Sequence, residues 1–239
     1  WLMYRALPLP DHVALDDGDS RAAADAFRAE MARRHTVRDF TDTPIPRDII
    51  ETCIAVAGSA PSGANHPPLR FVVLSNPAAN AAIRAASEAE ERHFYDGGGG
   101  DEWLAALEPI GTNADKPHLT TAPWLIVIFA ERYGVNPDGS RRKNYYVPES
   151  VGIATGFLIA ALHHAGLSSL TQTPNPMTCL TGLCRRPASE KPVMILAGGT
   201  AAADATVPEV AKRKTAMAQR LNVREEIKYG GGSRGGGEE

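Results

Sequence analysis

Residues 146–174 have the sequence YVPESVGIATGFLIAALHHAGLSSLTQTP, and this stretch decides the fold of the chain. Pro148 and Glu149 suit the first turn of a helix, where proline lacks a donor that would be unpaired anyway and a carboxylate meets the positive end of the helix dipole. Residues 151–167 carry no formally charged side chain. The helix predicted there is therefore apolar nearly all round and lies in a core or a subunit interface. Glycine, threonine and histidine interrupt it too often for a membrane span, and Gly166 favours its C-terminal end.

A short strand is predicted directly after this helix. Residues 167–173 are rich in leucine, serine and threonine, and Pro174 stops them. Because strand side chains alternate between faces, Thr171 and Thr173 are expected to share one face.

Composition is ordinary for a globular chain. The 239 residues are 43% hydrophobic and 22% charged, with a net charge of -3 and a pI near 6.2. One domain accommodates this length, and the charge gives no reason to expect nucleic acid or an anionic membrane as a partner. The three cysteines (Cys53, Cys179 and Cys184) lack zinc-ligand spacing and are interpreted as reduced, which predicts a cytoplasmic protein. The chain starts at Trp1 rather than a methionine, which leaves room for an upstream segment.

The remaining elements follow from local signals. We expect an extended arm over residues 1–19, a single domain over 20–229 and a disordered glycine-rich tail over 230–239. Helices are expected from an N-cap at Ser20 to about Arg34, over 45–57, after the Asn76 cap, and from Asn175 through Leu183; strands are expected over 69–75, 123–129 and 193–197. Arg141, Arg142 and Lys143 are expected in a solvated loop.

Two stretches have the composition of ligand-binding segments. Residues 33–38, with the sequence RRHTVR, place cations and a hydroxyl where they could hold a phosphate, although a solvated helix end fits the same residues. Residues 60–68 form a loop of small residues whose backbone amides could approach a planar ligand, or a plain turn between helix and strand. No arrangement of residues predicts a metal site.

A third stretch combines charge with flexibility. Glu91 and Tyr95 lie four residues apart on one helical face, and four consecutive glycines (97–100) follow them as a candidate hinge or lid. Lys116 comes next in a polar segment. We expect residues 88–118 to form the lid.

Taken together, these motifs resemble the flavin-dependent nitroreductase superfamily and, within it, the iodotyrosine deiodinase subgroup of reductive halotyrosine dehalogenases. The resemblance spans about residues 33–214. It rests on the stretches at 34–38, 60–64, 145–146, 171–174, 205–208 and 212–214. Glu91, Tyr95 and Lys116 match the amino-acid clamp of the subgroup and are its most specific part.

The resemblance implies an α+β fold of three layers, α/β/α, with a mixed, mostly antiparallel sheet in an intertwined homodimer that binds FMN at the subunit interface. It implies that the FMN phosphate and ribityl chain are held by Arg34, His35, Thr36, Arg38 and Arg213, and that further cofactor contacts come from Pro61, Ser62, Gly63, Thr171, Gln172 and Thr173. The loop around Ser62 would come from the partner subunit.

The resemblance also implies two kinds of chemistry. Thr173 matches a hydroxyl that donates toward flavin N5 and tunes the one-electron steps of the cofactor, which makes it the catalytic candidate. Glu91, Tyr95 and Lys116 would hold the ammonium and carboxylate of a tyrosine, while the amide of Ala64 meets its phenolate.

The implied activity is the reduction of iodotyrosine to tyrosine and iodide, with electrons from NAD(P)H directly or through a reductase. A broad nitro or quinone reductase of the same fold and a flavin-binding module without turnover remain as alternatives. A flavin-fragmenting relative shares the fold but has no need of a zwitterion clamp. His35 stands where animal members have a second arginine, which weakens its phosphate assignment.

Overall fold

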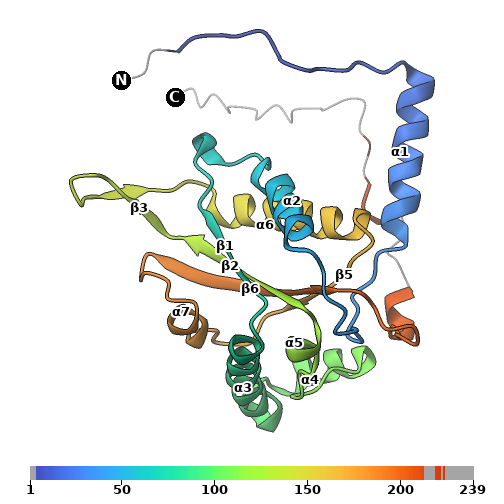
Figure 1. Cartoon of the computed structure of the whole chain (residues 1–239), viewed down its shortest axis with the longest axis vertical. Coiled ribbons are helices and arrows are strands. Elements are labelled where there is room, and N and C mark those ends of the chain that lie inside the picture. The colour runs from blue at the N-terminus through green and yellow to red at the C-terminus, as the bar shows by residue number, and fades with distance from the viewer. Residues whose placement is uncertain (1–3, 213–218, 222, 224–239) are drawn as a thin grey trace, which may run out of the picture.

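A computed structural model describes residues 4–212, 219–221 and 223 of the chain, and its centre is a four-stranded sheet (Figure 1). The strands follow the order β1 (Leu69–Leu74), β2 (Trp124–Glu131), β6 (Glu190–Gly199) and β5 (Ser168–Gln172), and every neighbouring pair is antiparallel. A parallel bridge joins Thr36 to Ser169 at the β5 edge. The sheet is therefore mixed and mostly antiparallel, as predicted.

Seven α-helices and a small hairpin surround this sheet in the described residues. The helices are α1 (Asp17–Ala32), α2 (Arg47–Gly58), α3 (Pro77–His93), α4 (Asp101–Leu107), α5 (His118–Thr121), α6 (Val147–His164) and α7 (Cys179–Leu183). Short turns of other helical types cover Gly63–Asn65, Phe94–Gly98, Glu108–Ile110 and Glu209–Lys212. The hairpin pairs β3 (Tyr133–Val135) with β4 (Arg141–Lys143).

Helices cover both faces of the sheet and give three layers (Figure 1). On one face α2 and α6 pack on the sheet through Ile50, Leu158 and Leu162, against Ile126 and Leu196. On the other face α3, α5 and α7 contribute Ile83, Leu119 and Leu180 to a second cluster around the alternate strand residues. The buried side chains of β2 alternate between these two apolar cores, with Leu125, Val127 and Phe129 in one and Ile126 and Ile128 in the other.

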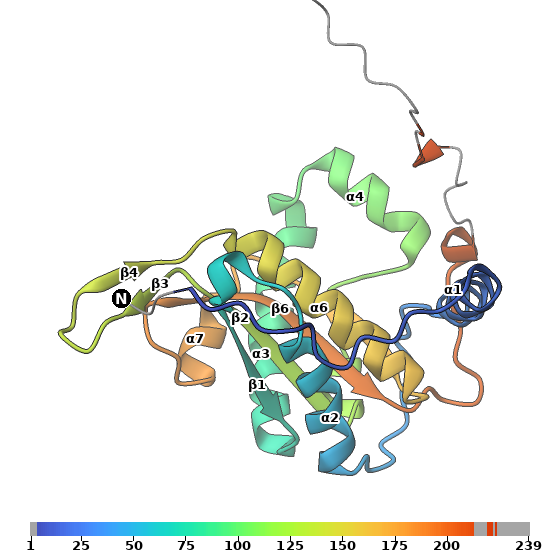
Figure 2. The same ribbon diagram turned by 90° about the horizontal axis from the view of Figure 1, so that it is seen from above.

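The apolar helix α6 is only half covered within one chain. Val151, Ala154, Leu158 and Leu162 are buried, whereas Ile153 is 41% and Phe157 39% exposed. Figure 2 shows α6 lying across the top of the sheet beside α2. Among the described residues no helix combines the length and hydropathy that crossing a membrane requires.

Three predictions of local structure are wrong. α1 begins at Asp17 rather than after Ser20, because the Asp16 carboxylate accepts the Asp19 N–H at 2.9 Å and caps the helix. The helix expected from Asn175 begins only at Cys179, since Met177 has a left-handed φ of 59° that breaks the helical path.

The third error concerns Arg141, Arg142 and Lys143. They form β4 rather than a loop, and the Arg141 guanidinium lies 4.2 Å from the centre of the Tyr133 ring on β3.

Candidate active site

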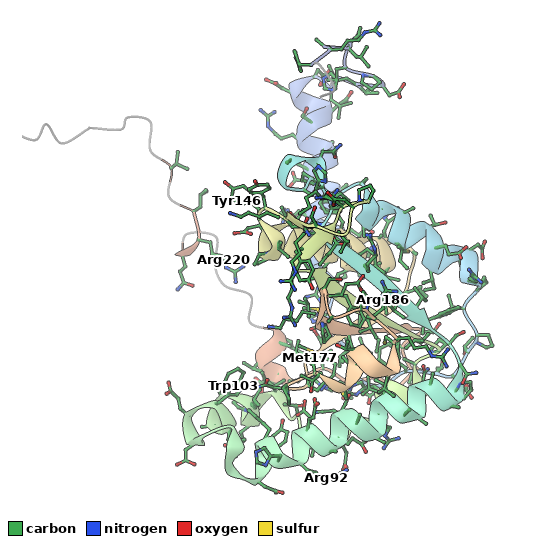
Figure 3. The ribbon with its side chains drawn as sticks, turned by 90° about the vertical axis from the view of Figure 1, so that its left-hand side faces the viewer. Arg92, Trp103, Tyr146, Met177, Arg186 and Arg220 are labelled. Carbon is green, nitrogen blue, oxygen red and sulfur yellow. The ribbon has the colours of Figure 1, made fainter. Side chains whose placement is uncertain are left out.

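A pocket of about 430 Å³ lies where the chain leaves β5. Its lining comes from Arg38, Glu91, Phe94, Tyr95, Trp103, Leu107, Ile110, Thr112, Leu170, Thr171, Gln172, Thr173, Pro174, Asn175 and Met177. Figure 3 labels Trp103 and Met177 near this pocket. The structure thus brings six of the predicted site residues (Arg38, Glu91, Tyr95, Thr171, Gln172 and Thr173) to one cavity.

The segment after α1 reaches this pocket because it is joined to the sheet. The Val37 N–H donates to the Ser169 carbonyl at 3.3 Å, next to the bridge between Thr36 and Ser169. This attachment carries Arg38 to the pocket wall, with Arg34 and His35 preceding it in the same segment. Arg213 lies outside the described residues.

Glu91 lines the pocket, and two side chains contact its carboxylate. Its Oε1 accepts from Gln172 Nε2 at 2.8 Å, and its Oε2 lies 3.3 Å from Lys116 Nζ. The Glu91 side chain is only 13% exposed and that of Lys116 3%. α3 and the segment before α5 therefore present a buried ion pair at the pocket.

Lys116 is held on several sides. Its Nζ donates to the Asn113 carbonyl and, at 3.3 Å, to Thr112 Oγ1. Its own N–H donates to Glu88 Oε1 at 2.9 Å, and the Arg84 Nε binds the same oxygen at 2.6 Å. Burial lowers the pKa of Lys116, opposed by the negative charge of Glu91. This lysine is a buried, oriented cation rather than the exposed side chain that its polar neighbours suggest.

His118 lies behind the pocket and was not predicted. It is 4% exposed, and its Nε2 has no hydrogen-bond partner among the described residues. Burial lowers its pKa to about 4, as does the charge of Lys116, whereas a hydrogen bond with Gln172 raises it. A lone histidine in the stretch PHLTT carries no sequence signal for such a position.

Aromatic side chains form the outer wall of the pocket. The Phe94 ring meets Tyr95 edge to face at a centroid distance of 5.4 Å and meets Trp103 in the same way at 5.9 Å. Lys116 Nζ lies 5.7 Å from the centre of the Tyr95 ring. A side-chain carbon on Gly99 would fall 2.5 Å from the Phe94 ring, so this glycine is needed for close packing of the wall. Neither Trp103 nor Met177 was among the predicted site residues, because a single large apolar residue gives no signal for a ligand.

The loop around Ser62 lies elsewhere in the chain. Pro61 and Ser62 line a separate pocket of about 270 Å³, and the Gly63 N–H donates to Ser150 Oγ at 3.4 Å on α6. A side-chain carbon on Gly63 would contact both the Tyr145 carbonyl and the Tyr146 ring. In Figure 3 Tyr146 lies well away from Trp103 and Met177. One chain therefore does not join this loop, which includes the exposed Ala64, to the pocket at β5.

Comparison with known proteins shows which family and which relatives the chain is similar to. The model of the nitroreductase family matches residues 31–200. A protein from Haliscomenobacter hydrossis named iodotyrosine deiodinase is 48% identical over 186 residues, which cover 78% of this chain and 84% of the relative. One of the same name from Nematostella vectensis is 37% identical over 210 residues, covering 87% and 79%.

A crystal structure agrees with the sequence comparison. Oxidised iodotyrosine deiodinase bound to FMN and 3-iodo-L-tyrosine superposes with a TM-score of 0.69 at 27% identity, covering 84% of this chain and 100% of that one. A nitroreductase with bound FMN from Bacteroides fragilis superposes with a TM-score of 0.60 at 20% identity, covering 83% and 98%, and supports the fold alone. The chain belongs to the nitroreductase family.

Proposed function

We propose that this protein is an FMN-dependent dehalogenase that reduces iodotyrosine to tyrosine and iodide. The observation that carries the proposal is the buried ion pair of Glu91 and Lys116, whose Oε2 and Nζ lie 3.3 Å apart. Its Glu91 lines the same pocket as Thr173. Relatives that are named iodotyrosine deiodinase, at 37–48% identity, support it.

The residues at β5 fit FMN by their chemistry. The phosphate of FMN requires fixed cations, and Arg38 at the pocket wall supplies a forked guanidinium, with Arg34 and His35 close by in sequence. Thr36, Thr171 and Thr173 offer hydroxyls for the polar ribityl chain and ring edge. We assign these residues, the amide groups of the loop at 61–63, and Arg213 to cofactor binding.

The clamp would recognise the two charges of an amino acid. The Glu91 carboxylate accepts from the substrate ammonium, while Lys116 and the Tyr95 hydroxyl donate to the substrate carboxylate. When the substrate binds, the contact between Glu91 and Lys116 is replaced by two others. Glu91 then faces the substrate ammonium, and Lys116 faces the substrate carboxylate. Closure of residues 88–118 over the ligand would then exclude water from the reacting ring.

The reaction replaces a carbon–iodine bond by a carbon–hydrogen bond. Bound FMN supplies the two electrons in its reduced form; one proton joins the ring carbon and iodide leaves. Thr173 donates a hydrogen bond toward the flavin edge, and Ala64 N–H steadies the phenolate oxygen of the substrate. The electrons for the next cycle come from NAD(P)H, directly or through a reductase.

A homodimer would complete the site. Two apolar hollows of about 640 and 750 Å³ flank α6, and the exposed Ile153 and Phe157 lie on the same helix. A second copy would cover these side chains and bring its loop at 61–64 to the pocket at β5. Such an arrangement explains why one chain keeps the two halves of the predicted site apart.

The cytoplasmic location predicted from the cysteines is also a proposal. Cys53, Cys179 and Cys184 are all free thiols, which a reducing compartment preserves.

The test of the function is iodide release by the purified protein. We expect a yellow dimer by absorbance and sedimentation that, once loaded with FMN and reduced with dithionite, converts iodotyrosine to tyrosine and iodide in equal amounts. A protein that takes up FMN and reduces nitroarenes or quinones, yet releases no iodide, would instead be the broad reductase of the same fold.

A further inference from the structure

A line of three polar side chains runs behind the clamp, and the function proposed above assigns its inner part no role. Gln172 on β5 donates to Glu91 on α3, and His118 on α5 lies close enough to Gln172 for a hydrogen bond that raises the pKa of its imidazole. Gln172 is 8% and His118 4% exposed. Three separate elements are thus joined through side chains that bulk water hardly reaches.

The donors and acceptors along this line have one consistent arrangement. An ionised carboxylate only accepts hydrogen bonds, so the 2.8 Å contact with Glu91 Oε1 requires Gln172 to present its amide nitrogen there. The amide oxygen of Gln172 is then left as an acceptor, and the His118 imidazole is the group that can donate to it. Such a bond from His118 would fix which way the amide of Gln172 points.

Glu91 needs such a fixed partner because Lys116 competes for it. Glu91 lies two residues before the end of α3, and the irregular turn Phe94–Gly98 follows directly. Without Gln172, both carboxylate oxygens could turn to Lys116 Nζ, which already lies 3.3 Å from Oε2. Lys116 would then hold both oxygens of Glu91 instead of one, and the ammonium of a ligand would have to displace it from both.

We propose that Gln172 is a positioning residue for Glu91, with His118 orienting its amide, and that together they keep one carboxylate oxygen available to the substrate ammonium. This inference rests on the proposed function. It differs from the cofactor role predicted for Gln172, because the side-chain donor of Gln172 is used by Glu91 and its backbone lies in the β5–β6 ladder opposite Ile195.

The test compares two ligands in Gln172→Met, which keeps the length of the side chain and removes the amide. Iodotyrosine carries the ammonium, and 4-iodophenol lacks it. Loss of one hydrogen bond to a charged group predicts about tenfold weaker binding of iodotyrosine. Binding of iodophenol and of FMN should stay within about twofold, with all affinities measured on the FMN-loaded protein by flavin fluorescence.

A double-mutant cycle identifies the route of the effect. If Gln172 acts through Glu91, Gln172→Met should cost iodotyrosine binding little further once Glu91→Gln is present. His118→Phe should reproduce the selective loss, and His118→Gln, which retains an amide donor, should restore part of it. Gln172→Asn keeps the amide but shortens its reach, and it provides the same test if Gln172→Met does not fold.

The outcomes separate this inference from the function beneath it. Wild-type protein that binds iodotyrosine no better than iodophenol overturns the halotyrosine function, and the inference with it. Wild-type discrimination that survives unchanged in Gln172→Met and His118→Phe overturns the inference alone. Weaker FMN binding in Gln172→Met, with equal losses for both phenolic ligands, would return Gln172 to a cofactor role.

Discussion

Acidification should destabilise the protein through His118. This side chain is 4% exposed, and its pKa is lowered from 6.5 to about 4 by burial and then by the charge of Lys116. Arg38 and Arg84 lower the pKa slightly further, and a hydrogen bond with Gln172 opposes the shift. The unfolded chain therefore takes up a proton near pH 6.5, whereas the folded chain takes it up only near pH 4. The free energy of unfolding should fall as the pH drops through this window. At about 1.4 kcal/mol per pKa unit the full loss is about 3 kcal/mol.

Urea unfolding followed by tryptophan fluorescence, between pH 7 and 4 at one protein concentration, measures this slope. His118→Gln should flatten it, while His12→Gln, in the exposed N-terminal arm, serves as the matched control. Glu88 also stabilises the folded chain, but its effect changes at lower pH. Burial raises the pKa of Glu88, but hydrogen bonds from the Lys116 N–H and Arg84 outweigh burial and lower this pKa below 4.5. Its contribution is thus lost below that pH. Equal slopes in wild type and His118→Gln between pH 6.5 and 4.5 would refute the reasoning.

Three further substitutions test the site. Thr173→Ala should retain FMN yet lower iodide release about five- to tenfold, because one hydrogen bond to the flavin edge is lost; nitroarene reduction should persist, and an unchanged ratio of the two activities would count against its role. Arg38→Met should weaken FMN binding by about one to two orders of magnitude, measured by fluorescence titration, since a charge-assisted bond contributes about 1.5 to 3 kcal/mol; an unaltered affinity would remove Arg38 from the phosphate site. Gly99→Ala should displace the Phe94 ring and weaken iodotyrosine binding about fivefold. The control is Gly58→Ala on α2, where an added carbon meets nothing within 4 Å, and it should leave iodotyrosine binding unchanged. Similar binding by the two variants would show that close packing of this wall is not required.

Residues 146–174 predicted α6 and β5 well because the ends of both elements carry clear signals. Pro148 and Glu149 indicate the start of a helix, the long uncharged run indicates that it is buried, and Pro174 ends the short strand that follows; α6 and β5 occupy these places. The exact ends of the helices were harder to predict. Asp16, Asp17, Asp19 and Ser20 can all cap a helix, and only the hydrogen bond to the Asp19 N–H selects the first.

The site was only partly predictable because its contacts are long-range. The resemblance identified Glu91, Tyr95 and Lys116, which the structure brings together with centroid and ion-pair distances of 5.7 and 3.3 Å. The contact between Glu91 and Gln172 joins residues 81 positions apart, and no local pattern encodes it. Burial of Lys116 and His118 likewise depends on how α5 packs beside α3, which their polar sequence neighbours conceal.

Substrate titration of Glu91→Gln tests the zwitterion clamp most directly. The change keeps the size of the side chain and removes the charge that faces the substrate ammonium. We predict that 3-iodotyrosine binds the FMN-loaded variant about one to two orders of magnitude more weakly than wild type, from the loss of about 1.5 to 3 kcal/mol. Binding of 4-iodophenol, which has no ammonium, should change little. Equal losses for both ligands, or no loss for either, would contradict the clamp and leave the protein a broad flavin reductase.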